Sequence, residues 1–140
     1  MIKRLLYTSR AAEGVGLRDA YDIIRTSHNR NSRAGVTGGL IFMDGHFLQL
    51  LEGLPAAVDE RYARIAADGR HEEVRTRIEQ TVESAAFEGD WMALRDGSRI
   101  DADVLERHGY EPGMPTAGGE ALLALLLEAF DRELSACAAA

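Results

Sequence analysis

Residues 40–51 read LIFMDGHFLQLL, two apolar runs separated by Asp44-Gly45. An Asp-Gly pair between two such runs is the strongest short-range signal for a β-hairpin, because a two-residue turn needs the left-handed backbone that these residues tolerate. The stretch therefore predicts two antiparallel strands, Leu40–Met43 and Phe47–Leu51, joined by a tight turn.

One helix is predicted on each side of this hairpin. Before it, apolar residues recur at three- and four-residue steps from Leu17 to Ser27 or His28, and we expect that amphipathic helix to end near residues 29–31. After it, Pro55 suits the first turn of a second helix and Gly69 supplies its C-terminal stop. One side of the second helix carries Val58, Tyr62 and Ile65.

The outer strands complete the fold class. Residues 2–9 are apolar and aromatic, residues 74–82 alternate with a period of two, and residues 91–94 form one further candidate strand. The order strand, helix, hairpin, helix, strand, strand predicts an α+β, ferredoxin-like (βαββαβ) mixed sheet. It has an added fifth strand, and both helices lie on one face.

The C-terminal part is predicted to cover the other face of the sheet. Residues 101–109 form a short candidate helix and residues 109–119 a linker. A last helix carries a wide apolar stripe, which lets it pack on the sheet and also meet another protomer. The stripe consists of Leu123, Leu126, Leu127, Phe130 and Leu134, broadened by Leu122 and Leu125.

Composition and charge exclude several classes of protein. The 140 residues, 46% hydrophobic and 28% charged, suit one packed domain rather than a disordered segment. A net charge of -7 disfavours nucleic-acid binding. The longest strongly apolar run, residues 121–127, is too short to span a membrane, and no signal peptide is recognised. The single cysteine, Cys137, forms no internal disulfide, so we expect a cytoplasmic location.

Gln49 is the polar residue that most needs an explanation. Strand alternation puts it between Phe47 and Leu51 on an apolar face, where an amide needs hydrogen-bond partners. It either bonds to a neighbour within the core or belongs to a site. Tyr7 is one candidate partner, although Tyr7 is equally compatible with an ordinary position at a sheet edge. Asn31, at the predicted end of the first helix, is interpreted first as a capping residue.

A second set of polar residues is predicted near the helix ends. Arg70 and His71, together with Arg30, offer a local positive site for a phosphate or carbonyl group, unless each is a solvated surface charge. No two histidines have metal-ligand spacing, so no metal site is predicted. Glu52 and Asp68 lack any accompanying Ser/His/Asp or Cys/His motif, so no hydrolytic machinery is predicted either.

Four stretches together resemble one known family: Leu5-Leu6-Tyr7-Thr8-Ser9, Asn31 with Gly35-Val36-Thr37-Gly38, Phe47-Leu48-Gln49-Leu50-Leu51-Glu52-Gly53, and Asp68-Gly69-Arg70-His71. In order and spacing, residues 2–94 resemble the BLUF family, the blue-light sensors that use flavin adenine dinucleotide (FAD). The resemblance implies a photosensor domain at residues 1–95 and a helical extension at residues 96–140 for signalling or oligomerisation. It is also the only ground for preferring FAD over flavin mononucleotide (FMN).

The resemblance also implies the functional site. The flavin ring lies between the two helices, Asn31 bonds to its polar edge, and Gln49 bridges it to Tyr7. Light drives electron and proton transfer from Tyr7 to the flavin, and Gln49 then rearranges its hydrogen bonds. The flavin absorption shifts to the red until the dark state returns. The further implied flavin contacts are Arg30, Asp68, Arg70 and His71.

One departure from the family pattern concerns the path of the signal. Family members usually carry a tryptophan three residues after a phenylalanine and a methionine five residues after it. Here Phe87 is followed by Asp90 at the tryptophan position and Met92 at the methionine position. Because strand side chains alternate, Asp90 and Met92 are expected on one face and Trp91 on the other, unless a bulge at Gly89 shifts the register. These residues, Asp90, Trp91 and Met92, are the predicted transmission segment.

Three functions are compatible with this sequence. The leading hypothesis is a non-enzymatic photoreceptor that signals through its C-terminal helices to an unknown protein partner or to copies of itself, as a homodimer or larger assembly. The second is an interaction module that kept the fold and lost photoactivity, which the Asp90 departure favours. The third is a small ferredoxin-like enzyme, such as a dimeric monooxygenase, because a fold alone does not fix a function.

Overall fold

A computed structural model describes residues 1–110 and 118–132 of the chain. It contains a five-stranded sheet with the spatial order β4-β1-β3-β2-β5. Neighbouring strands are antiparallel except β2 and β5, which are parallel. This is the predicted ferredoxin-like sheet with a fifth strand added beside β2. The strands are β1 (Ile2–Ala11), β2 (Thr37–Met43), β3 (His46–Gly53), β4 (His71–Val82) and β5 (Ala93–Asp96).

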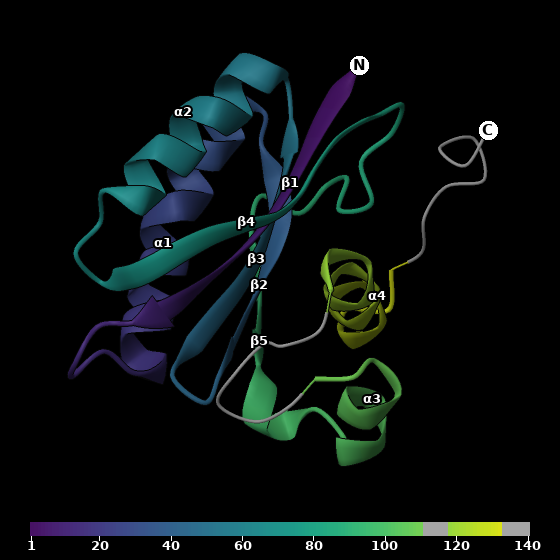
Figure 1. Cartoon of the computed structure of the whole chain (residues 1–140). Coiled ribbons are helices and arrows are strands. Elements are labelled where there is room, and N and C mark those ends of the chain that lie inside the picture. Colours follow the sequence, from purple (N-terminus) through teal and green to yellow (C-terminus); the bar gives the residue numbers. More distant parts are fainter. Residues whose placement is uncertain (111–117, 133–140) are drawn as a thin grey trace.

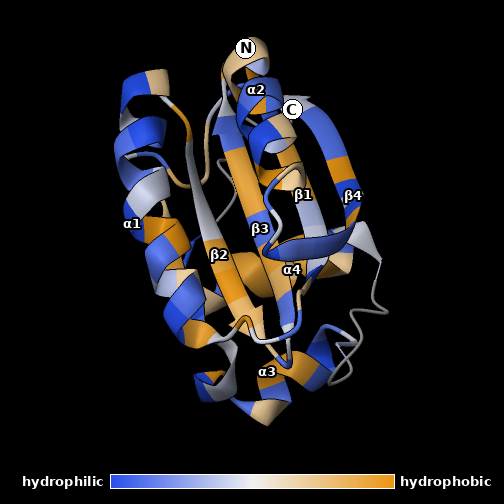
Figure 2. Cartoon of the chain, turned by 90° about the vertical axis from the view of Figure 1, so that its left-hand side faces the viewer, coloured by the Kyte–Doolittle hydropathy of each residue, from blue (hydrophilic) through white to orange (hydrophobic). Residues whose placement is uncertain are grey.

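Helices lie on both faces of this sheet. As predicted, α1 (Leu17–Ala34) and α2 (Pro55–Ala66) share one face, and α4 (Gly119–Ala129) packs on the other beside the short α3 (Ala102–Arg107) (Figure 1). The outer faces of α1 and α2 are hydrophilic, whereas the central strands behind them are largely hydrophobic (Figure 2). A single 3-10 turn, Gly97–Arg99, connects β5 to α3.

The sheet separates two apolar cores. Leu5 and Tyr7 of β1 point into the core beneath α1 and α2, while Leu6 between them points into the core beneath α4. The same alternation in β3 puts Phe47 and Leu51 on the α1/α2 side and Leu50 on the α4 side. Strand periodicity therefore decides which β1 and β3 side chains reach the space between the helices.

The hairpin between β2 and β3 forms as the sequence predicts. Asp44 and Gly45 both have a left-handed backbone, with φ of 51° and 74°, and Met43 faces His46 across the turn. The tight turn fixes the register of the two central strands.

The first helix is one turn longer than predicted. It continues to Ala34, and Gly35 ends it with φ of 71° and an N–H donated to the Asn31 carbonyl oxygen. The left-handed C-terminal position is therefore filled by Gly35, and the capping interpretation of Asn31 is wrong. Asn31 lies inside the last turn, and its side chain does not cap the helix.

The second helix begins at Pro55 as predicted but ends before Gly69. Its last residue is Ala66, and Ala67 closes it with an ordinary right-handed backbone. The Asp68 carboxylate then accepts the Arg70 N–H at 3.0 Å, which forms a side-chain-stabilised turn after the helix. Gly69 is thus part of this turn and not the helix stop.

The fourth and fifth strands differ most from the prediction. β4 starts at His71 rather than Val74, and two register shifts against β1 interrupt the clean alternation. β5 starts at Ala93, so Asp90, Trp91 and Met92 lie before it in an irregular segment, directly after a turn at residues 86–89 where Gly89 has φ of 90°. Strand alternation does not apply to an irregular segment, so the expectation that Asp90 and Met92 share a strand face is wrong.

The apolar stripe of α4 is buried within this chain. Leu122, Leu125 and Leu126 are completely inaccessible and belong to the core beneath α4. These leucines therefore leave no apolar surface for a second protomer, contrary to the sequence-based expectation; Leu134 lies outside the described residues. No helix in residues 1–110 or 118–132 has the length and apolar character that crossing a membrane requires.

Candidate functional site

Tyr7 and Gln49 form the centre of the site. The register of β1 and β3 places them directly opposite each other, with both side chains buried on the α1/α2 side. Tyr7 Oη donates a hydrogen bond to Gln49 Oε1, so the partner suggested for Gln49 is the observed one. Burial raises the pKa of the Tyr7 phenol well above its usual value, which keeps it protonated and able to donate.

The other end of the Gln49 amide contacts the segment before β5. Gln49 Nε2 donates to Met92 Sδ at 3.3 Å, and Met92 is buried in the core beneath α1 and α2. The methionine at the family position therefore reaches Gln49 despite the Asp90 departure. Both ends of one amide are engaged, so any rearrangement of Gln49 changes its contacts to Tyr7 and Met92 together.

Asn31 brings an unused acceptor to the same face of the sheet. Its side chain is fully buried, and Nδ2 donates to the Trp91 carbonyl oxygen at 2.7 Å. Its Oδ1 has no hydrogen-bond partner within the described residues. A buried amide oxygen normally finds a donor, so this position suits a ligand that carries an N–H group.

The Asp68-Gly69-Arg70-His71 stretch lies at the C-terminal end of α2. Arg70 donates to both Asp68 oxygens, and these bonds lower the pKa of the Asp68 carboxyl. His71 is buried, with Nδ1 2.8 Å from Ser9 Oγ and its ring 4.6 Å from that of Phe47. Burial lowers the pKa of His71, so the ring is neutral at neutral pH.

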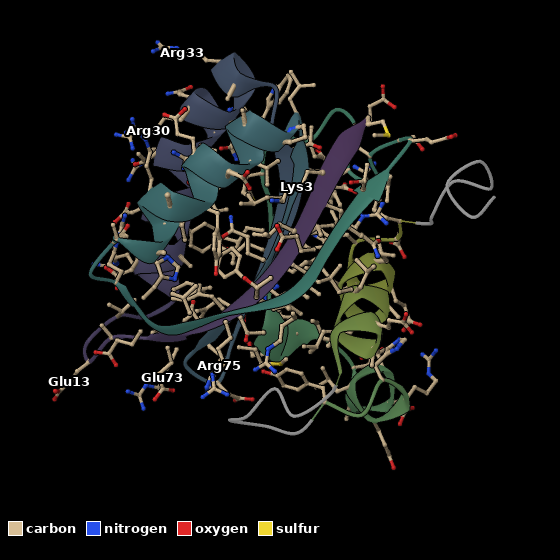
Figure 3. The ribbon with its side chains drawn as sticks, turned by 45° about the horizontal axis from the view of Figure 1, so that its top comes forward. Lys3, Glu13, Arg30, Arg33, Glu73 and Arg75 are labelled. Carbon is tan, nitrogen blue, oxygen red and sulfur yellow. The ribbon has the colours of Figure 1, made fainter. Side chains whose placement is uncertain are left out.

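A positively charged cleft runs between α1 and α2 above these residues. Four arginines line it against one carboxylate, Asp68, on a chain whose net charge is -7. Ile23 and Ser27, from the middle of α1, also line this cleft. Arg70 and His71 therefore lie across the cleft from the middle of α1 rather than from its end. Arg30 extends from α1 to solvent (Figure 3). The four arginines are Arg30, Arg61, Arg64 and Arg70.

Arg61 and Arg64 are the two cleft arginines that sequence reasoning missed, and Arg61 is the buried one. The predicted stripe of the second helix assigned Tyr62 to the buried side, yet Arg61 is the more deeply buried of the two neighbours. Arg61 follows Val58 by three residues and precedes Ile65 by four, so its spacing also fits that stripe. This spacing was the sequence signal from which the burial of Arg61 could have been predicted.

The predicted transmission segment connects the site to the other face of the sheet. Asp90 pairs with Arg132, just after α4, and the Arg132 guanidinium lies 5.4 Å from the centre of the Phe87 ring. Arg95 Nε donates to the Ala129 carbonyl oxygen at 3.1 Å. The end of α4 is thus held to residues 87–95 by two arginines.

Glu52 lies on the α4 side and supports the same segment. It forms a fully buried ion pair with Arg4, with Arg4 Nε 2.8 Å from Glu52 Oε2, and its Oε1 accepts the Phe87 N–H at 3.0 Å. Glu52 is therefore a structural carboxylate. Within residues 1–110 and 118–132, no three His, Cys, Asp or Glu side chains gather as a metal-binding group.

Known proteins match this chain in sequence and in fold. The family model described as sensors of blue-light using FAD (BLUF) matches residues 2–93. The photoactivated adenylate cyclase subunit beta of Euglena longa is 33% identical over 87 residues, which are 62% of this chain and 10% of that protein. The chain thus spans only about a tenth of the length of that curated relative.

Two solved structures extend the comparison. BlrB, a BLUF protein in its dark state, superimposes with a TM-score of 0.69 and 33% identity over 76% of this chain and 82% of BlrB. BlsA in its photo-activated state gives a TM-score of 0.82 over 96% of this chain and 99% of BlsA, at 23% identity, which supports the fold including the C-terminal helices. The chain belongs to the BLUF family, the blue-light sensors that bind a flavin.

Proposed function

We propose that Tyr7 and Gln49 carry out the light response of this blue-light sensor. A bound flavin supplies the chromophore that absorbs blue light and accepts an electron. Tyr7 is the electron and proton donor, and its Oη–H already has an acceptor in Gln49 Oε1. Gln49 then exchanges the donor and acceptor ends that it presents to its neighbours. The Tyr7–Gln49 hydrogen bond in a fully buried setting is the observation that carries this proposal.

The side chains around this pair fit a flavin. Asn31 offers a free buried acceptor for a ring N–H. Arg70 and Arg30 offer donors for carbonyl or phosphate oxygens, while Asp68 orients Arg70 and His71 packs behind the site. We propose these five residues as the flavin-binding set, with FAD as the cofactor suggested by the family description.

The experiment is an absorption spectrum of the full chain in the dark and directly after blue light. The wild type is expected to show a flavin spectrum that shifts to the red and returns in the dark. Gln49→Leu keeps the side-chain volume but removes both ends of the amide, so the flavin should bind without the shift. Gln80→Leu is the matched control, because Gln80 is an exposed residue of β4 whose side chain accepts from Arg4 on the α4 side of the sheet, away from Tyr7 and Gln49.

Two outcomes contradict the assignment. An unchanged shift in Gln49→Leu would overturn the role of Gln49. A wild-type flavin spectrum that never shifts would favour the alternative function, a silent interaction module, which the Asp90 departure makes a specific candidate.

We further propose that residues 1–95 form the sensor and residues 96–140 the output. Met92 accepts from Gln49, the Trp91 carbonyl accepts from Asn31, and Asp90 pairs with Arg132 just after α4. This segment therefore contacts both the site and the end of α4, which supports the division. The output is association with an unidentified protein or a second copy of the chain, rather than an enzymatic reaction. Light-scattering measurements of molar mass in the dark and in the light test the self-association. The single cysteine supports a cytoplasmic location.

A further inference from the structure

Arg61 occupies a position where a charged residue is unusual. It lies in the middle of α2 on the stripe that faces the sheet, between the buried residues Val58 and Ile65, and only 7% of its surface is exposed. Arginine is rarely buried to this extent unless it is paired. The position therefore calls for a partner.

The protein supplies no such partner in the part of the chain that the structure describes. The Nε–H of Arg61 has no hydrogen-bond acceptor there. Its neighbours in the cleft are engaged elsewhere, since Arg64 pairs with Glu60 and Arg70 with Asp68. Burial, together with the nearby charges of Arg30 and Arg64, lowers the pKa of Arg61. Holding this cation between the helices costs folding free energy, so stability alone does not explain it.

Two observations link Arg61 to the site. Its charge acts on Tyr7: burial dominates and raises the pKa of Tyr7, while the Arg61 charge opposes this increase. Among the buried side-chain atoms of the described residues, the other one in the α1/α2 layer without a hydrogen-bond partner is Asn31 Oδ1, one helical turn beyond Ser27 of the cleft. This layer thus holds an unused hydrogen-bond donor on α2, Arg61 Nε, and an unused acceptor on α1, Asn31 Oδ1. A ligand that carries both an acceptor and a donor matches these two atoms.

We propose that Arg61 is a further flavin-binding residue of this chain, whose guanidinium donates to an oxygen of the flavin. The oxygen belongs either to the phosphate or to a ring carbonyl, because both are acceptors that guanidinium recognises. This inference rests on the binding of a flavin in the cleft between α1 and α2. Arg61 is chemically a binding and positioning residue, since no electron or proton passes through it.

The test is the dark affinity of the flavin-stripped full chain for riboflavin, FMN and FAD, measured by fluorescence titration. We expect Arg61→Met to weaken binding about ten- to a hundredfold, the loss typical of one hydrogen bond from a charged group. A loss for FMN and FAD but not for riboflavin assigns the contact to the phosphate. An equal loss for all three assigns it to the ring.

A second readout separates ligand binding from a structural role. Without flavin, Arg61→Met is expected to raise or keep the melting temperature, because it removes a buried unpaired charge, whereas a structural arginine would lower it. Arg61→Lys keeps a charge with fewer donors and should bind more weakly than the wild type but more tightly than Arg61→Met. Arg25→Met is the matched control, since Arg25 is exposed on α1 and pairs with Asp22.

Affinities of Arg61→Met and Arg61→Lys within twofold of the wild type for all three flavins would overturn the inference. Failure of the photochemical proposal is recognised separately, because it leaves dark affinities intact and removes only the light-induced shift. Wild-type protein that binds none of the three flavins would overturn both.

Discussion

Gln49 bonds to Tyr7 with one end of its side-chain amide and to Met92 with the other, and the contact with Tyr7 could be predicted from sequence. The period of two in a strand is a local property, so the burial of Gln49 and its closeness to Tyr7 follow from alternation and pairing. The buried position of Arg61 could not be chosen from the same kind of pattern. Arg61 and Tyr62 both fit the helical stripe, so only the tertiary packing of α2 decides which of the two is covered more deeply.

His71 gives a pH-dependent prediction at the residue scale. Burial lowers its folded pKa below the unfolded value of about 6.5, so the unfolded chain binds its proton more readily. The free energy of unfolding should therefore fall as the pH decreases through about 6.5. Urea denaturation between about pH 8 and pH 5 measures this slope.

The comparison variants isolate His71 from other titrating groups. His71→Gln should show a shallower dependence over this interval, whereas His28→Gln, on the exposed side of α1, should keep the wild-type slope. Equal slopes in all three proteins would mean that His71 does not contribute to acid sensitivity.

At the scale of elements, local signals predicted the hairpin but not the start of β5. The Asp44-Gly45 turn is encoded by its own two residues. The turn before β5 depends instead on Gly89 and on the Glu52 carboxylate, which accepts the Phe87 N–H from 35 residues away in the chain. A contact between residues so far apart in the chain produces no periodic pattern in the sequence. The alternation of a strand was therefore wrongly extended to Asp90.

The ends of the two helices give the prediction at this scale. Gly35 has φ of 71° at the end of α1, so Gly35→Ala should destabilise the protein by about 1 kcal/mol. Gly69 has no left-handed backbone, and the space that an alanine Cβ would occupy is open, so Gly69→Ala should be neutral or slightly stabilising. Chemical denaturation measures both. A larger loss for Gly69→Ala than for Gly35→Ala would contradict the observed helix ends.

At the scale of the whole molecule, one chain of contacts joins the two faces of the sheet. Tyr7, Gln49 and Met92 lie on the α1/α2 side, and two residues before Met92 the side chain of Asp90 pairs with Arg132 at the end of α4. A change in the Gln49–Met92 contact can therefore reach α4 through a segment of three residues. The ion pair is partly exposed, so it stabilises the fold by less than about 1 kcal/mol, weak enough to be broken by a local rearrangement.

Removing this ion pair should uncouple α4 from the light signal. In the wild type, we expect illumination to speed amide hydrogen exchange in the last turn of α4. In Asp90→Asn, that turn should already exchange fast in the dark and show no further change in the light, while the red shift of the flavin is retained, because Gln49 and Tyr7 are untouched. Mass spectrometry measures amide exchange in α4, and absorption spectra measure the red shift of the flavin. The two measurements together report on both α4 and the flavin site.

Two further variants make this prediction specific to the Asp90–Arg132 contact. The charge swap Asp90→Arg with Arg132→Asp should restore slow dark exchange and its light dependence. Arg107→Gln breaks the pair between α3 and Glu128 of α4 and should leave the light-dependent difference intact, because Arg107 has no link to Met92. If Asp90→Asn instead kept the wild-type response in α4, the signal would have to leave the sheet through another contact, and the Arg95 bond to Ala129 would be the next one to remove.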